Sequence, residues 1–225
     1  MATDSRSRME RDSFWILHSR AWRDTSVILE VLSQRHGRIG VVVRAGRKNH
    51  QLQPFRLLSG RLSGRGELLN LTDCEAEIQP LNLTGRALFC GLYLNELLIR
   101  LLHRHDPHPE ICDPYHHTLE QLAAGALPQD VLLREFELML LDTLGYGFAL
   151  EQDVAGDPID PAGHYVLIAD HGLQQQTQGF VGEHLLAMAS RDWRDDVRRT
   201  ARQLLRQALA AHLGDKPLVS RELFR

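Results

Sequence analysis

The stretch SVILEVLSQRHGRIGVVVRA, residues 26–45, contains two short apolar runs separated by a turn pair at residues 36–37. In the second run Ile39, Val41 and Val43 fall on one face of a strand, because successive side chains point to opposite faces. The arginines of this run fall on the other face. The pattern predicts two β-strands, the second with one face in a core and a basic face directed outward.

Three more runs of this kind occur before residue 80, and turn residues bound each of them. The predicted strands are Phe14–Trp22, Ser26–Ser33, Ile39–Ala45, Phe55–Ser63 and Leu68–Ile78. Five short antiparallel strands in about seventy residues are typical of a small closed barrel of the oligonucleotide-binding (OB) type. An SH3-like barrel would give nearly the same pattern, so the strand count predicts the class and not the topology.

The predicted barrel is basic. Residues 20–65 contain ten basic side chains and two acidic ones, residues 1–80 hold 13 Lys and Arg against 9 Asp and Glu, and residues 81–225 hold 13 against 20. The formal net charge of −3 therefore hides a basic module joined to an acidic one. A small basic β-module is a candidate polyanion binder. The alternative is a barrel whose arginines only keep its surface soluble.

After residue 83 the apolar period changes to about 3.6, which predicts helices. The predicted helices cover residues 83–102, 113–122, 129–144, 183–189 and 192–213, with a short strand at 165–169. Gly145 is placed to close the third helix in a left-handed conformation. The expected fold class is α+β, with an N-terminal five-stranded OB-type β-barrel followed by an α-helical bundle domain. The expected parts are a flexible leader at 1–12, the OB-type domain at 13–80 and the helical domain at 81–225, with an irregular insert at 148–190.

Several classes of protein are disfavoured. Cys74, Cys90 and Cys112 are odd in number and form no CxxC pair, which favours a reducing compartment over a disulfide framework. The first thirteen residues lack the apolar stretch of a signal peptide. The most apolar segment, residues 83–102, is interrupted too often by polar side chains for a membrane span. We expect a cytoplasmic protein without membrane attachment.

No common catalytic or nucleotide-binding motif is present, neither GxSxG, Walker A, GxGxxG nor HExxH. Histidines and one cysteine crowd residues 103–117, but a zinc site would need a second cysteine, and a loop that exposes histidines is the commoner explanation. Carboxylates at residues 153–160 lack the calcium-loop spacing. We expect neither a metal nor another cofactor, and no enzymatic activity. A two-metal nuclease would need acids that converge from different elements.

Six sequence blocks carry a resemblance to a known family. They are Gly37–Arg38, Leu52–Phe55, Gly64–Glu67, Gly91–Leu98, Phe136–Gly147 and Lys216–Phe224. In these blocks, which span roughly residues 12–225 in the same order, the chain resembles the bacterial DNA repair protein RecO family. The resemblance implies an N-terminal OB barrel, a helical C-terminal domain and a role as a recombination mediator.

The resemblance also implies partners. Such proteins bind single- and double-stranded DNA, anneal complementary strands, engage the C-terminal tail of the single-strand-binding protein SSB, and act with RecR to load RecA. We expect a monomer that is associated with the nucleoid. Relatives that bind zinc carry a four-cysteine finger, whereas residues 148–190 contain no cysteine. The loop of residues 44–54 is also shorter and less basic than is usual in the family.

The expected DNA contacts are Arg20, Arg38, Arg44, Arg47, Lys48 and Arg65. Phe14, Trp15 and Trp22 are candidates to stack on bases, although aromatic side chains of a small barrel more often belong to its core. A basic face that contacts backbones suppresses the repulsion between two strands and leaves their bases free to pair, so annealing needs no ATP motif.

The SSB tail is an acidic peptide that ends in apolar residues and a carboxylate, so its receptor should combine an apolar groove with a cation. Arg134 lies two residues before Phe136. The resemblance implies that it occupies the position where the family motif carries a basic residue linked to binding of the SSB tail. The alternative for Arg134 is an ion pair with Glu137 or Asp130.

Four arginines of the last predicted helix share one stripe, where a solvated face is favoured over a binding surface. They are Arg194, Arg198, Arg202 and Arg206. Two other functions stay open for the chain as a whole. One is an OB-type RNA-binding protein, and the other is a helical scaffold without nucleic-acid activity.

Overall fold

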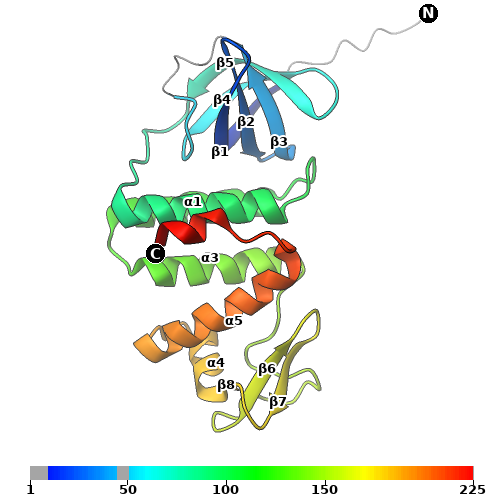
Figure 1. The fold of residues 1–225 in the computed structure, drawn as a ribbon, viewed down its shortest axis with the longest axis vertical. Coiled ribbons are helices and arrows are strands. Elements are labelled where there is room, and N and C mark those ends of the chain that lie inside the picture. Colours follow the sequence, from blue (N-terminus) through cyan, green and yellow to red (C-terminus); the bar gives the residue numbers. More distant parts are fainter. Residues whose placement is uncertain (1–9, 45–50, 225) are drawn as a thin grey trace, which may run out of the picture. The chain divides into compact units, whose positions relative to one another are not determined.

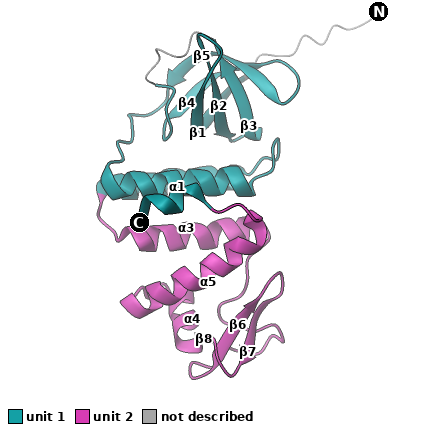
Figure 2. Cartoon of the chain, viewed as in Figure 1, with its two compact units in different colours: residues 1–124, 218–225 teal, residues 125–217 magenta. Residues whose placement is uncertain are grey.

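The structure is a computed structural model that describes residues 10–44 and 51–224. The chain divides into two compact units (Figures 1 and 2). The first unit comprises residues 1–124 and 218–225, and the second comprises residues 125–217. The division does not fall near residue 80, where charge and apolar period change, because the first helices and a C-terminal segment belong to the same unit as the barrel.

The first unit begins with a closed five-stranded barrel (Figure 1). Its strands are β1 (Glu10–Trp22), β2 (Ser26–Ser33), β3 (Gly37–Val43), β4 (Leu57–Ser63) and β5 (Leu68–Ala76). Their order around the barrel is β1-β2-β3-β5-β4, with β3 and β5 parallel and the other pairs antiparallel. The predicted OB-type barrel is confirmed.

Alternation within the strands builds the barrel core. Ile39 and Val41 of β3 are fully buried, whereas Arg38 and Arg44 are directed away from the core, as the sequence predicts. β1 contains an irregularity between Ile16 and His18 that shifts its register with β2. It also begins earlier than expected, because residues 10–12, which were assigned to the leader, pair with β4.

Three helical elements of the first unit follow the barrel in sequence, and a fourth comes after residue 217. They are α1 (Gly85–Leu101), η2 (Pro109–Ile111), α2 (Cys112–Ala124) and η3 (Val219–Phe224). The buried Asn95 of α1 links them to the barrel, because its amide donates to the Leu17 carbonyl at 2.7 Å and accepts from the Tyr115 hydroxyl at 2.5 Å. Trp15 packs edge-on against Tyr115, with ring centroids 5.5 Å apart.

The second unit contains three helices and a small sheet (Figure 1). Its elements are α3 (Gln129–Thr143), β6 (His164–Ile168), β7 (Gly172–Gln176), β8 (Phe180–Val181), α4 (Gly182–Ala189) and α5 (Asp195–Leu213). The sheet order is β7-β6-β8, and its buried Tyr165 and Leu173 share a core with α4 and α5. Residues 148–190 were expected to form an irregular insert with one short strand and one helix. They contain that strand as β6 and that helix as α4, and β7 and β8 complete a sheet that was not expected. None of the helices in the described residues is both long and apolar enough to cross a membrane.

Candidate nucleic-acid interface

The arginines of the barrel fall into two groups that differ in their partners. On the β4 and β5 side, Arg11 pairs with Glu75 at 2.7 Å and Arg61 pairs with Asp73 at 3.4 Å. Within residues 10–44 and 51–224, no ion pair is made by Arg20, Arg23, Arg44 or Arg65, all of which are exposed. The charges of Arg11 and Arg61 are therefore neutralised by carboxylates, whereas these four exposed arginines have no ion-pair partner in the described residues.

Strand register brings most of the uncompensated charge together. Arg20 pairs with Ile28, which pairs with Val42, and Trp22 pairs with Ser26 at the β1–β2 turn. Arg44 directly follows the end of β3, and Arg23 lies in the β1–β2 turn. Because paired residues share a face, Arg20 and Trp22 lie on the outer side of the barrel, and the exposed Arg44 follows β3 at the same end. We call Arg20, Trp22, Arg23 and Arg44 the arginine face.

Arg65 does not join this face. It lies in the loop between β4 and β5, before Leu68, and Leu68 pairs with Gly40 in a parallel ladder. Residues that precede Leu68 therefore lie toward the start of β3, whereas Arg44 follows its end. Of the other predicted DNA contacts, Arg47 and Lys48 lie outside the described residues.

The three aromatic side chains of β1 have different environments. Phe14 and Trp15 are buried, whereas Trp22 is 39% exposed. The Cζ atoms of Arg20 and Arg23 lie 5.8 and 5.9 Å from the centroid of the Trp22 ring. An exposed cation–π contact at such a distance contributes about 0.5–1 kcal/mol. Trp22 is therefore the aromatic side chain of β1 that a ligand can reach, and two cations lie beside it.

Arg38 is committed to an internal network. Its side chain is 15% exposed, its Nη1 pairs with Glu30 at 2.7 Å, and its Nε donates to the Leu102 carbonyl at 2.9 Å. Burial lowers the pKa of the Arg38 guanidinium, with a further decrease from Arg104 and an opposing increase from Glu30. These contacts fasten β3 to the segment after α1 and leave little of the guanidinium for a ligand.

Arg104 is a cation near the face that the sequence analysis did not identify. Its Nη2 pairs with Glu30 at 2.7 Å, and its Nη1 lies 3.1 Å from the position that a Cβ atom on Gly40 would take. Arg104 thus covers the outer side of β3 at Gly40, two residues before Val42, which lies in the same row of paired residues as Arg20. No local pattern indicates this placement, because Arg104 lies in a loop far from the barrel strands in sequence.

The predicted SSB-tail residues lie on α3. Arg134 is buried and pairs with the fully buried Glu137 at 2.7 Å, which is one of the two alternatives considered for it. Phe136 is also buried. Among the described atoms, Arg134 Nε has no hydrogen-bond partner.

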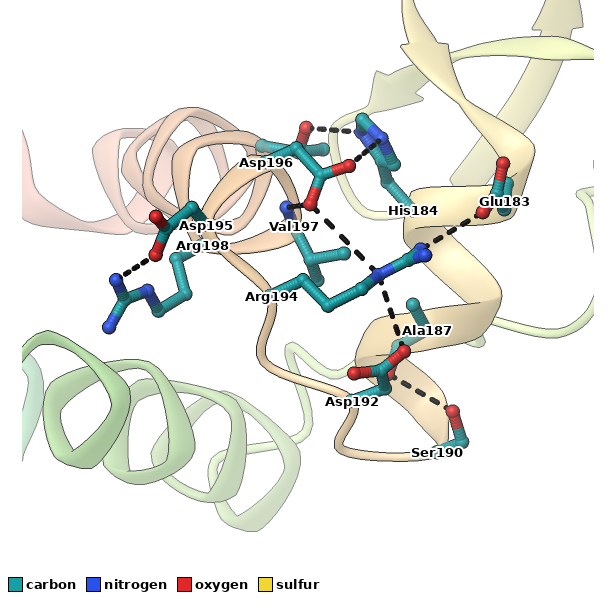
Figure 3. Close-up of polar contacts among 11 residues, drawn as sticks. Glu183, His184, Ala187, Ser190, Asp192, Arg194, Asp195, Asp196, Val197 and Arg198 are labelled. Carbon is teal, nitrogen blue, oxygen red and sulfur yellow. Dashed lines mark hydrogen bonds and ion pairs between the residues drawn. The ribbon is translucent and has the colours of Figure 1, made fainter. Parts of the chain in front are cut away.

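Two arginines of the stripe connect α5 to neighbouring helices, Arg194 to α4 and Arg198 to α3. Figure 3 shows Arg194 among three carboxylates, with Glu183 at 3.0 Å, Asp192 at 3.3 Å and Asp196 at 4.0 Å. The hydrogen bond to Glu183 raises the pKa of Arg194. Arg198 pairs with Asp195 and, at 3.5 Å, with Asp130 of α3. Arg202 and Arg206 are exposed.

The histidine-rich segment offers no metal cluster in the described residues. Across residues 10–44 and 51–224, no three His, Cys, Asp or Glu side chains lie close enough together to hold a metal ion. Burial raises the pKa of the Cys112 thiol to about 12, which favours the protonated form over the thiolate that zinc requires.

Sequence comparison places these features in a family. The family model described as "Recombination protein O N terminal" matches residues 8–78, and that described as "Recombination protein O C terminal" matches residues 83–222. The chain belongs to the RecO family. The RecO N-terminal model spans the OB-type barrel and its arginine face, and the RecO C-terminal model extends from the start of α1 into η3.

Individual RecO proteins match over nearly the whole chain. The DNA repair protein RecO of Pseudomonas paraeruginosa is 47% identical over 217 residues, which cover 93% of this chain and 92% of the relative. That of Pseudomonas putida is 46% identical, with 94% and 95% covered, and that of Stutzerimonas stutzeri is 45% identical, with 93% and 91% covered. RecO is thus a family of DNA repair proteins to which this chain is similar in both its units.

Proposed function

We propose that the chain is a recombination mediator that binds single- and double-stranded DNA, anneals complementary strands and helps to load RecA onto SSB-coated DNA together with RecR. The observation that carries this proposal is the arginine face. At one end of an OB-type barrel in a RecO chain lie three arginines that have no carboxylate partner among the described residues. Uncompensated guanidinium groups are the side chains that phosphate oxygens bind best.

The chemistry of annealing needs little more than such a surface. Two single strands repel each other through their phosphates, and a basic face that covers backbones lowers that repulsion while bases stay free. Base pairing then proceeds downhill without ATP. We propose that the chain acts by binding and not by catalysis, without a cofactor, as a monomer in the cytoplasm near the nucleoid.

The proposed contacts are Arg20, Arg23, Arg44 and Arg65, together with Arg47 and Lys48. Arg38 is the weakest member of the predicted set, because Glu30 and Leu102 already occupy its guanidinium. If about six cations contact phosphates, log affinity for a single strand falls against log salt with a slope near −4. A titration of a labelled oligonucleotide from low to moderate salt measures that slope, and a slope near zero contradicts the proposal.

A fluorescence-quench assay tests annealing directly. Complementary oligonucleotides, one with a fluorophore and one with a quencher, are coated with SSB and mixed with or without the protein. We expect the protein to accelerate quenching, with the acceleration lost at high salt. An RNA strand of the same sequence separates DNA from RNA binding, because contacts to 2′-hydroxyl groups would favour RNA.

For the SSB tail we propose Arg134 and Phe136 of α3 as contacts. The support is the resemblance of these positions to the family motif. Arg134 is 9% and Phe136 is 2% exposed, so the tail would reach them only after side chains of α3 move. Arg134→Glu is a poor test, because it would set two buried carboxylates beside each other at positions 134 and 137. In Arg134→Gln with Glu137→Gln the charges are removed together, and we expect weaker binding of a labelled tail peptide with unchanged DNA affinity. Equal loss of both activities would indicate misfolding instead.

A further inference from the structure

Trp22 is an exposed aromatic ring set among cations. It is the last residue of β1, on the outer side of the barrel, and its cross-strand partner is the small Ser26. No second large side chain therefore lies opposite the ring on β2. Arg20 and Arg23 lie beside it, and Arg44 follows the neighbouring end of β3.

We propose that Trp22 is a base-stacking site, which takes one unpaired base of a single strand whose phosphates lie on Arg20, Arg23 and Arg44. This inference rests on the proposed DNA-binding function and adds a contact to the base itself. The ligand is defined by its chemistry: a planar base carried on a chain of negative charges.

The exchange of contacts favours the base. An exposed cation–π contact is equivalent to about a two- to fivefold factor in affinity, whereas a base stacked on an aromatic side chain is equivalent to about a 5- to 150-fold factor. A base that displaces one guanidinium from the ring therefore gains more than it removes. The displaced guanidinium stays within the same face, where a phosphate of the same strand can accept its hydrogen bonds.

Stacking on Trp22 also distinguishes unpaired from paired DNA. Bases within a duplex are stacked on one another, so none can offer its face to a side chain unless it is first unstacked. The arginines contact phosphates of either form. Trp22 thus supplies preference for the single strand, and it must release its base when the complementary strand pairs.

The test distinguishes contacts with bases from contacts with phosphates. Wild type, Trp22→Ala and Trp22→Phe are titrated with an oligothymidine of 16 nucleotides (a chosen length, roughly one OB-fold site) and with an abasic oligonucleotide that has the same number of phosphates. We expect Trp22→Ala to lower affinity for the oligothymidine about 5- to 150-fold and to change affinity for the abasic strand less than about twofold. The salt slope should not change, because no cation is removed.

The matched control is Leu68→Ala. Leu68 is an exposed apolar side chain of the same barrel, 42% exposed on β5, and lies outside the arginine face. We expect both oligonucleotides to bind Leu68→Ala as they bind wild type. Trp22→Phe keeps an aromatic ring and should retain most of the oligothymidine affinity.

Tryptophan emission gives a second readout that does not depend on Trp22→Ala folding. Trp15 is buried and Trp193 donates to Glu135 in the second unit, so quenching by oligothymidine should be present in wild type and absent in Trp22→Phe. The same quenching in Trp22→Phe overturns the inference, as does an equal loss of thymidine and abasic binding in Trp22→Ala. If wild type binds neither oligonucleotide in a salt-dependent way, the proposed DNA-binding function itself fails.

Discussion

Arg20 and Arg61 lie on the same barrel but differ in what surrounds their guanidinium groups. Arg61 has Asp73 at 3.4 Å, whereas Arg20 has the ring of Trp22 and no carboxylate partner in the described chain. A guanidinium already paired with a carboxylate gains less from a phosphate, because the first contact must be broken. The partner of each arginine therefore indicates which ones are available to DNA.

This difference predicts distinct effects on salt dependence. Arg20→Ala combined with Arg44→Ala should make the salt slope of single-strand binding shallower by about 1.4, because each phosphate contact contributes about 0.7. Arg61→Ala is the matched control and should leave the slope unchanged. Titrations at several salt concentrations measure both slopes. A change of about 0.7 in Arg61→Ala, half that of the double variant, would show that total charge, and not the arginine face, governs binding.

Cys112 gives a pH-dependent prediction. Burial raises the pKa of its thiol from 9.0 to about 12, so the folded chain keeps this proton to higher pH than the unfolded chain does. The associated stability is complete below pH 9 and is lost as pH rises toward 12. At pH 10 the loss from this thiol should be about 1 kcal/mol. Urea unfolding at pH 8 and pH 10 should show a smaller decrease for Cys112→Ala than for wild type, and equal decreases would contradict the assignment.

At the scale of elements, a carboxylate on α1 holds η3 in place. Glu96 accepts from the backbone N–H groups of Val219 and Ser220 at 2.8 Å each and from the Ser220 hydroxyl at 2.5 Å. Phe224 also packs edge-on against Phe89 of α1, with ring centroids 6.2 Å apart. One side chain thus satisfies three donors at the start of a short 3₁₀ helix.

Replacing this carboxylate should release η3. In Glu96→Gln an amide nitrogen takes the place of one accepting oxygen, so we expect the free energy of unfolding to fall by about 1–3 kcal/mol. Limited digestion with trypsin should cleave after Arg221 faster than in wild type. Glu67→Gln, which changes an exposed carboxylate of the barrel, is the control. Unchanged cleavage of Glu96→Gln would mean that apolar contacts alone hold the segment.

Elements with a strong apolar pattern could be predicted from sequence, and those without one could not. β2 has the predicted bounds, and Gly145 takes the predicted left-handed conformation after α3, with φ of 77°. β7 was missed because its sequence, GLQQQ, buries only its first two residues. Strand pairing with β6 and not apolar alternation defines it.

The candidate site was predictable only in part, for a related reason. Alternation placed Arg38 and Arg44 on the outer face of β3, which is correct for both. It carried no information on Glu30 and Arg104, which reach Arg38 from β2 and from a loop after α1. Whether an exposed-face arginine is free depends on such partners, and those contacts come from residues distant in sequence.

At the scale of the whole molecule, the first unit is discontinuous in sequence, because residues 218–225 belong with residues 1–124. Leu218 is buried within it, whereas Val219 is 74% exposed. The C-terminal segment is therefore a structural part of the unit that also contains the barrel.

Removal of this segment should affect the first unit. We expect deletion of residues 218–225 to lower the melting temperature and to increase binding of a hydrophobic dye, because apolar surface of α1 becomes exposed. Val219→Ser changes an exposed position of the same segment and should leave both measurements unchanged. A deletion variant that melts as wild type does would show that the segment adds no stability.

The discontinuity also has a consequence for synthesis on the ribosome. Residues 125–217 emerge before residues 218–224, so the partner of Glu96 is not yet available while the second unit is being translated. In the nascent chain the strands of the barrel are complete while α1 still lacks its contacts with η3. The order of translation thus makes completion of the N-terminal unit one of the last steps in folding.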